Sequence, residues 1–419
     1  MRALLGILAA TLVVAGCGRA SGPPVSGGGF NLYEAAATKG SYLIAVIGTR
    51  SQTVERTLPW GTLTAKHLYS VSGRTLSDID PDTGSTIRTL PLPYSFQLPQ
   101  VSASGVAGGL SQNGRWLALE YPASNPDGRD SFGSHLLVID TTTMKVAVPV
   151  DLPGHFNFDA ISNDGQRIYL IEYVSDAIYR VRFYNVGSHQ LDPTIVVDKS
   201  NPQEKMVGTR LSGVASPDGQ WLYSVYARPH QGAFIHALNL TQPFAFCLEL
   251  PGGGYVSSPD EMQWSLALSA DGTHLFAANG AMGIVAELNT GPNGGPSVTR
   301  SVRVDGSTAS SDSLVQNVEA KEFGTGGVVL SADGKTLVMT GKTGLVWVDT
   351  ATLHSRSHQL AGWNVASLGL SPDGSFVYAL SDSSMVAELS FANPSSPTTF
   401  GASSGQPLAL IRVDPARPS

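Results

Sequence analysis

The chain has 419 residues, a formal net charge of −7 and only 14% charged residues. This acidic balance, without a Lys/Arg cluster on the mature chain, excludes the basic patch that a nucleic-acid partner requires. The 46 glycines and 26 prolines favour a fold of short strands and turns, and no helix longer than a turn or two is predicted.

The N-terminal residues indicate an export signal. After Arg2, residues 3–15 form an apolar run that is too short to span a bilayer but suits a signal peptide. The run ends in Val14-Ala15-Gly16-Cys17, which resembles the lipobox of bacterial lipoproteins, where a lipidated cysteine becomes the mature N-terminus. The resemblance implies more than one acyl chain on Cys17, which is enough for stable anchoring. The alternative is an ordinary cleaved signal followed by an incidental cysteine.

We therefore expect three regions. Residues 1–16 are the lipoprotein signal peptide, residues 17–40 are the lipidated Cys17 and a flexible tether rich in Gly, Ser, Pro and Ala, and residues 41–415 are the folded domain. The expected location is extracytoplasmic. The lipid would anchor the chain to the cell membrane, or to the outer membrane if the source is diderm.

A Ser-x-Asp/Asn-Gly turn recurs six times in the folded region. The spacings between successive turns are 51, 54, 53, 62 and 40 residues, and the turns begin at Ser111, Ser162, Ser216, Ser269, Ser331 and Ser371. A period of this size indicates a repeat architecture, and Asp-Gly or Asn-Gly between apolar runs is a strong hairpin signal. Adjacent apolar residues after the turns, such as Leu222-Tyr223, indicate strands covered on both faces. Four such strands per repeat describe a propeller blade.

The blades are counted in chain order. Residues 67–71, 75–80 and 85–90 predict strands of a first blade without the turn motif, and six further blades start near Val101, Phe156, Arg210, Gln263, Gly326 and Val365. We thus predict an all-β fold, a seven-bladed β-propeller of four-stranded antiparallel blades, and a monomer. The hairpin from Ser41 to Leu58 lies outside this count and is a candidate to complete the last blade, which would close the ring and remove exposed sheet edges.

These turns, with strands such as the one from His274 to Asn279, resemble the YVTN-type and other WD40-like propellers of bacterial exported proteins. The resemblance covers roughly residues 60–410. The Tyr-Val-x-Asn strand is nowhere literal, and the segment from Phe276 to Asn279 is its closest approach. Propeller lactonases share such turns, but no motif carries their catalytic residues over to this chain.

We identify no catalytic residue, metal site or cofactor site. The segment Gly401–Gly405 matches G-x-S-x-G, which has meaning only at a strand-to-helix elbow, and no helix is predicted there. The segment from Asp78 has the early spacing of a calcium loop, but its glycine is displaced to Gly84 and Thr89 replaces the glutamate, which favours a simple turn. The histidines show no metal-ligand spacing. Cys247, without a disulfide partner once Cys17 is lipidated, is interpreted as a small buried hydrophobe.

The long connections gather mostly at the end of the ring opposite the motif turns, where we expect a site, although drift of surface loops would explain them equally. Residues just before the inner strands are predicted to border the axial opening there: His155, Asn157, Arg210, Glu261, Trp264, Glu322 and Trp363. Such a mixture suits a small-molecule or glycan pocket, while packing between blades is the alternative for the aromatic residues. Two functions remain. We favour a non-catalytic scaffold that binds a protein, glycan or small ligand over a propeller hydrolase of the lactonase type.

Overall fold

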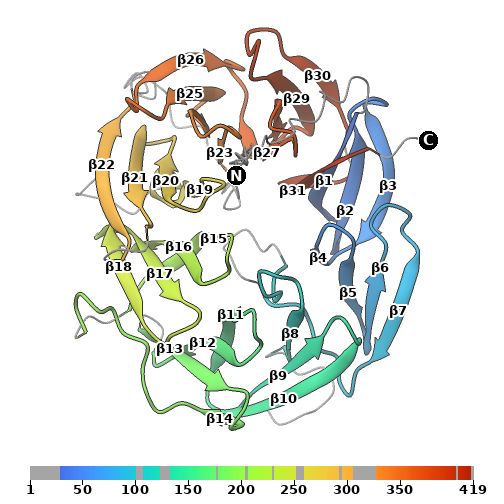
Figure 1. Cartoon of the computed structure of the whole chain (residues 1–419). Coiled ribbons are helices and arrows are strands. Elements are labelled where there is room, and N and C mark those ends of the chain that lie inside the picture. Colours follow the sequence, from blue (N-terminus) through green and yellow to red (C-terminus); the bar gives the residue numbers. More distant parts are fainter. Residues whose placement is uncertain are drawn as a thin grey trace, which may run out of the picture.

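The described residues form eight small antiparallel sheets arranged as blades around a central axis (Figure 1). The computed structural model describes residues 29–100, 107–122, 133–175, 178–202, 206–228, 231–251, 259–291, 295–304, 327–402 and 404–416. Within these ranges no helix is long and apolar enough to cross a membrane. The expected signal peptide and Cys17 lie outside the described residues.

We number the blades along the ring and give the strands of each from the axis outward. Blade 1 has β31 (Gln406–Pro415), β1 (Phe30–Thr38), β2 (Ser41–Gly48) and β3 (Thr53–Pro59). Blade 2 has β4 (Thr62–Leu63), β5 (Leu68–Ser72), β6 (Thr75–Ile79) and β7 (Thr86–Pro91). Blade 3 has β8 (Trp116–Glu120), β9 (Gly133–Asp140) and β10 (Lys145–Pro153). Blade 4 has β11 (Phe156–Ile161), β12 (Arg167–Tyr173), β13 (Tyr179–Asn185) and β14 (Gln190–Leu191).

The second half of the ring follows the same plan. Blade 5 has β15 (Thr209–Ala215), β16 (Trp221–Arg228), β17 (Gly232–Asn239) and β18 (Ala245–Glu249). Blade 6 has β19 (Trp264–Leu268), β20 (His274–Asn279), β21 (Ile284–Asn289) and β22 (Ser297–Arg303), preceded by the short 3-10 helix η1 (Pro259–Met262). Blade 7 has β23 (Val328–Leu330), β24 (Thr336–Thr340), β25 (Leu345–Asp349) and β26 (Ser355–Gln359). Blade 8 has β27 (Val365–Leu370), β28 (Phe376–Ser381), β29 (Met385–Ser390) and β30 (Thr398–Gly401).

The all-β propeller of four-stranded blades is confirmed, but the predicted count of seven is wrong because the described residues form eight blades. The hairpin from Ser41 to Leu58 does not complete the last blade. It pairs with β1, and β1 pairs with β31, so that both ends of the chain make a separate blade with strand order β3-β2-β1-β31. Strand β1 lies inside the segment expected as a tether, and its Phe30 to Ala36 are all buried. The Gly/Ser/Pro-rich composition therefore ends near Gly29.

The recurring motif forms a turn held by its own side chains. In the Ser216 turn, Ser216 Oγ donates to Asp218 Oδ1 at 2.5 Å and accepts the Trp221 backbone N–H at 2.9 Å. Asp218 Oδ1 also accepts the N–H of Gln220 at 2.9 Å. The motif glycines have φ between 68° and 74°, a left-handed conformation that glycine adopts without a Cβ penalty. The residue pattern that reveals the repeat is thus the pattern that closes each inner hairpin.

The core lies between the blades, because both faces of most strands are covered. One cluster joins blades 5 and 6 through Tyr223, Trp264 and Leu275, and another joins blades 1 and 2 through Tyr33 and Leu68. This two-sided burial explains the runs of adjacent apolar residues in the sequence.

Polar side chains also link neighbouring blades. Glu287 on β21 accepts a bond from Arg300 Nε at 2.5 Å, and its other oxygen lies 3.0 Å from His274 Nδ1. The same Arg300 reaches across to blade 7, where Nη1 and Nη2 donate to the backbone carbonyls of Ala351 and Thr350 at 2.6 and 2.5 Å. Blades 2 and 3 are linked in the same way. In blade 2, Asp78 accepts a bond from Arg88 and also contacts His67. The same Arg88 donates to the backbone carbonyls of Thr141 and Thr142 in blade 3. We call this arrangement the arginine latch.

Candidate functional site: an axial cavity

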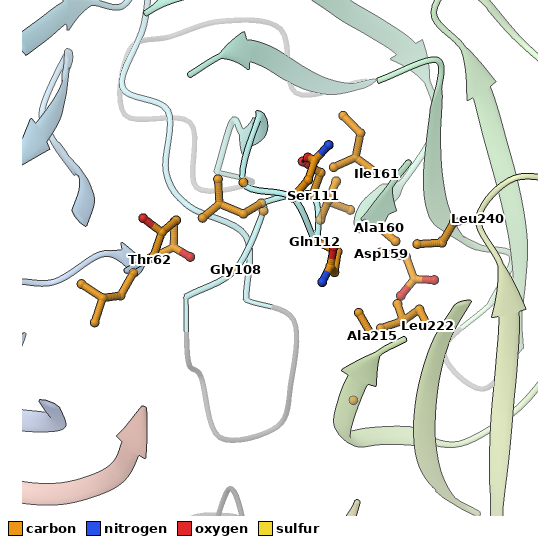
Figure 2. A pocket seen from close by; sticks show the side chains of 18 of the residues that line it. Thr62, Gly108, Ser111, Gln112, Asp159, Ala160, Ile161, Ala215, Leu222 and Leu240 are labelled. Atoms are coloured by element: carbon orange, nitrogen blue, oxygen red, sulfur yellow. The ribbon is translucent and has the colours of Figure 1, made fainter. Parts of the chain in front are cut away.

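A cavity of about 490 Å³ lies where the inner segments of blades 1 to 5 meet at the axis. Its walls come from β4 and the residues after it, the segment 108–114, β11, β15, and Arg412 of β31. Figure 2 shows Thr62 on one side, Asp159, Ala215, Leu222 and Leu240 on the other, and the segment from Gly108 to Gln112 between them. The lining mixes small apolar side chains, hydroxyl and amide groups, and one ion pair.

The cavity opens beside blade 3 because that blade has no regular inner strand in its described residues. The segment from Ala107 to Leu110 makes only isolated bridges, to Gln100 and Leu117. Gly108 and Gly109 contribute no side chains, and a Cβ at Gly109 would lie 2.5 Å from the Ala118 carbonyl oxygen. The glycines let this backbone pack tightly against β8 and leave space on the axial side.

Asp159 and Arg210 form the charged part of the wall. Arg210 Nη1 donates to Asp159 Oδ1 at 2.7 Å across the boundary between blades 4 and 5. The Asp159 side chain is 2% exposed and the Arg210 side chain 15%. A carboxylate that is buried this deeply needs a partner, because an unpaired buried charge costs several kcal/mol. The two charges neutralise each other and fix Arg210 in place.

Shifts in the strand-pairing register set the direction of the Asp159 and Arg210 side chains. In β11 the pairing register to β12 shifts between Phe158 and Ala160, so Asp159 is the extra residue of a β-bulge. In β15 the register to β16 shifts between Arg210 and Ser212. Bulges re-aim side chains and are frequent beside functional sites. The bulge in β11 explains how the charged Asp159 reaches the axis from a strand whose other residues are mostly apolar.

Arg210 keeps an unused donor. Its Nε has no hydrogen-bond partner among the described residues although it is buried. Gly213 makes room for the guanidinium, since a Cβ at that position would lie 2.8 Å from Arg210 Nη2. A buried N–H without an acceptor is costly, so a hydrogen bond donated by Arg210 Nε to a ligand oxygen would bring a net gain.

Two further titratable groups lie behind this wall. His236 on β17 is 2% exposed, and burial lowers the pKa of its imidazole to about 4, with Asp159 opposing and Arg210 reinforcing the shift. Glu120 on β8 accepts the backbone N–H of Phe158, and burial raises the pKa of its carboxyl to about 7 although this hydrogen bond opposes the shift. Near neutral pH the imidazole is therefore uncharged, and Glu120 is divided between its protonated and ionised forms.

Of the residues predicted to border the opening, the structure places only Arg210 among the residues that line the cavity. His155 and Asn157 are exposed at the start of β11. Trp264 is 1% exposed and belongs to the core between blades 5 and 6, and Trp363 packs partly buried against the core between blades 7 and 8. Glu261 lies in η1, with a side chain outside the described residues, and Glu322 lies outside them altogether.

Asp159 is not among the site residues that the sequence predicts. A signal existed, since Asp159 is a single acid in the apolar strand from Phe156 to Ile161, and a buried acid requires a partner. The partner could not be found from spacing because Arg210 stands 51 residues away on the next blade. The bulges that bring the two side chains together leave no clear mark in composition.

The G-x-S-x-G segment lies in a connection between two strands, and the segment after Asp78 lies in a turn. The segment from Gly401 to Gly405 connects β30 to β31, so its flanks are two strands rather than a strand and a helix, while Ser403 itself lies outside the described residues. The segment after β6 forms a turn in which the Gly84 N–H donates to the Asp80 carbonyl oxygen at 2.8 Å. Asp78 is buried in the arginine latch of blade 2.

The fold and cavity define a class, the eight-bladed β-propeller with an axial pocket. No family model matches the chain, and no curated protein matches it by sequence. Among solved structures it is similar to AztD from Citrobacter koseri, with a TM-score of 0.52 and 11% identity over 94% of this chain and 99% of that one. It is also similar to the periplasmic gluconolactonase PpgL of Pseudomonas aeruginosa, with a TM-score of 0.45 and 18% identity over 90% and 97%. A putative 6-phosphogluconolactonase from Bacteroides uniformis matches with a TM-score of 0.42 and 14% identity over 92% and 98%. At these identities the similarity shows the propeller fold and no specific function.

Proposed function

We propose that this protein is an extracytoplasmic, lipid-anchored propeller that binds a small polar molecule in its axial cavity without transforming it. The observation that carries the proposal is Arg210, held at the cavity wall by Asp159 with a buried Nε that has no partner among the described residues. The cavity volume of about 490 Å³ falls within the usual range of small-molecule sites. A ligand with a hydrogen-bond acceptor, such as a carbonyl or carboxylate oxygen, matches the unused donor.

The binding experiment is a thermal-shift screen of small polar molecules, followed by titration of the hits. We expect Asp159→Asn and Arg210→Met to weaken every hit that binds in the cavity by roughly tenfold or more, because a charge-assisted hydrogen bond is lost. Glu172→Gln is the matched control. It breaks the 2.8 Å ion pair with Arg182 in the same blade but is not in the cavity wall. Equal affinity of a hit for wild type and all three variants would show that the hit binds outside the axial cavity.

A lactone-hydrolysis assay tests the non-catalytic part of the proposal. We expect no turnover above background for wild type. Turnover that disappears in Asp159→Asn would overturn the binding function and favour the hydrolase alternative.

The anchor is tested separately. The residues Val14 to Cys17 support lipidation of Cys17, which would place the propeller at a membrane surface. In cells fed a fatty-acid analogue, we expect label on wild type and none on Cys17→Ser. Equal label on both proteins would remove the anchor from the proposal and leave the axial cavity untouched.

A further inference from the structure

A second polar cluster lies between blades 4 and 5, behind the cavity wall and outside the residues that line the cavity. His236 on β17 and Cys247 on β18 stand directly opposite each other in the strand pairing, and Cys247 Sγ lies 3.6 Å from His236 Nδ1. Met206 comes from the connection between the two blades, and its Sδ lies 3.9 Å from Cys247 Sγ. The Cys247 thiol thus has an imidazole nitrogen and a thioether sulfur as close neighbours.

These separations match two edges of a coordination triangle, the two that meet at Cys247 Sγ. A metal bound to sulfur at about 2.3 Å and to nitrogen at about 2.0 Å, with angles near 120°, sets nitrogen and sulfur about 3.7 Å apart and the sulfurs about 4.0 Å apart. The separations of 3.6 Å and 3.9 Å in the structure fall within a few tenths of an ångström of those values. The two strands need no rearrangement to bring the nitrogen and the thiol to one metal ion.

The packing around His236 fixes which ring nitrogen faces the cluster. His236 is 2% exposed, and its Nδ1 is the nitrogen that lies beside Cys247 Sγ. A metal bound through Nδ1 would leave the ring proton on Nε2, which has no hydrogen-bond partner among the described residues. Aromatic rings hold the histidine in place. Tyr226 contacts it edge-on with 6.1 Å between ring centroids, and Tyr179 stacks on Tyr226.

Met206 is also held in position. The Tyr179 backbone N–H donates to the Met206 carbonyl oxygen at 3.2 Å, which ties the connection to blade 4. Met206 and Cys247 are only partly buried, whereas His236 is enclosed. An ion can therefore reach the two sulfurs from the surface while the imidazole closes the site from within.

We propose that His236, Cys247 and Met206 form a binding site for monovalent copper. A set of one imidazole, one thiolate and one thioether is soft, and soft sulfur ligands select Cu(I) over harder divalent ions. Among the described residues no three His, Cys, Asp or Glu side chains are placed to hold a metal. The third ligand is therefore the thioether, which favours Cu(I) over Zn²⁺. This site does not depend on the ligand of the axial cavity.

The experiment is an anaerobic titration of the full-length chain with Cu(I), in competition with a coloured Cu(I) chelator. The chain has two cysteines, so the Cys17→Ser background leaves Cys247 as its single thiol. We expect one Cu(I) per chain. Cys247→Ser and Met206→Leu should each weaken binding by about tenfold or more, because each removes a soft ligand.

Met339→Leu provides the matched control, since Met339 is 1% exposed in blade 7 and far from the cluster in the ring. It should bind Cu(I) as the parent does. X-ray absorption of the copper-loaded parent should show two sulfurs and one nitrogen around the metal. Three results would each overturn the proposal: unchanged Cu(I) affinity in Cys247→Ser, a preference for Zn²⁺ over Cu(I), or a copper coordination shell without sulfur. The coordination shell is observed in the parent protein, so that result does not depend on whether the variants fold.

Discussion

Glu34 is a carboxyl group buried in blade 1 whose two oxygens have no hydrogen-bond partner among the described residues. It lies on β1 opposite Ala45 of β2 and Leu410 of β31, with 0% exposure. Burial raises the pKa of this carboxyl from 4.5 to about 7. The folded protein therefore binds the Glu34 proton more tightly than the unfolded chain does, and ionisation of Glu34 opposes folding.

The first prediction is a pH-dependent stability that comes from Glu34. Because the folded-state pKa is raised, the free energy of unfolding should fall as pH rises from about 4.5 to about 7 and then level off. Glu34→Gln should raise the free energy of unfolding at pH 8 by roughly 3 kcal/mol, following 1.36 kcal/mol per pKa unit, and change it little at pH 4.5. Urea unfolding at both pH values measures this. The exposed Glu55→Gln serves as control, and an equal pH slope in wild type and Glu34→Gln would contradict the prediction.

At the scale of the element, the motif turn depends on its glycine. Gly219 has φ of 68°, and a Cβ there would lie 2.0 Å from the Asn163 amide nitrogen of the neighbouring turn. Gly219→Ala should lower the free energy of unfolding by about 1–3 kcal/mol, because strain is added to the backbone and a contact between blades must shift. Gly187→Ala is the control, since that position has no positive φ and its nearest neighbour is 3.4 Å away. Equal losses in a urea titration of both variants would argue against the turn assignment.

The arginine latch gives another prediction at this scale. Arg300 is bonded both to Glu287 within blade 6 and to two carbonyl oxygens of blade 7, so Arg300→Met should cost about 1–3 kcal/mol and loosen that boundary. Arg356→Met should cost about 1 kcal/mol or less, because its ion pair with Asp349 lies on the exposed edge of a single blade. Thermal unfolding followed by circular dichroism compares them. A larger loss for Arg356→Met would contradict the idea that the latch joins the blades.

Local signals in the sequence predict local structure well in this chain. The Ser-x-Asp/Asn-Gly turns carry their own hydrogen bonds within five residues, as Ser216 and Trp221 show, so each repeat is visible in one short stretch. The candidate site is different. Asp159 meets Arg210 across a blade boundary, and Met206 meets Cys247 from a connection with no motif. Contacts of this kind depend on register and bulges, which single-sequence patterns do not encode.

At the scale of the whole molecule, ring closure explains the error in the blade count. Strands β1 and β31 are paired antiparallel, from Phe30 opposite Pro415 to Ala37 opposite Gln406, although they stand at opposite ends of the chain. Neither strand carries the motif turn, and β1 follows directly on a Gly/Ser/Pro-rich segment. A period-based count cannot assign such strands to a repeat, because the blade that they build exists only after the ring has formed.

The last prediction concerns this closure. Without residues 406–419, β1 becomes an unpaired inner edge, and the cores on its two sides lose Leu410, Ile411 and Val413. Blade 8 also loses the bond from the Leu410 N–H to Ser367 Oγ, at 3.0 Å. We expect the truncated chain to aggregate or to lose its cooperative thermal transition, because an exposed strand edge pairs with other chains. Removing residues 417–419 alone is the control and should leave the transition unchanged. Adding a synthetic peptide of residues 406–416 should restore part of the transition to the longer truncation. A truncated chain that melts as a monomer at the wild-type temperature would show that blade 1 does not close the ring.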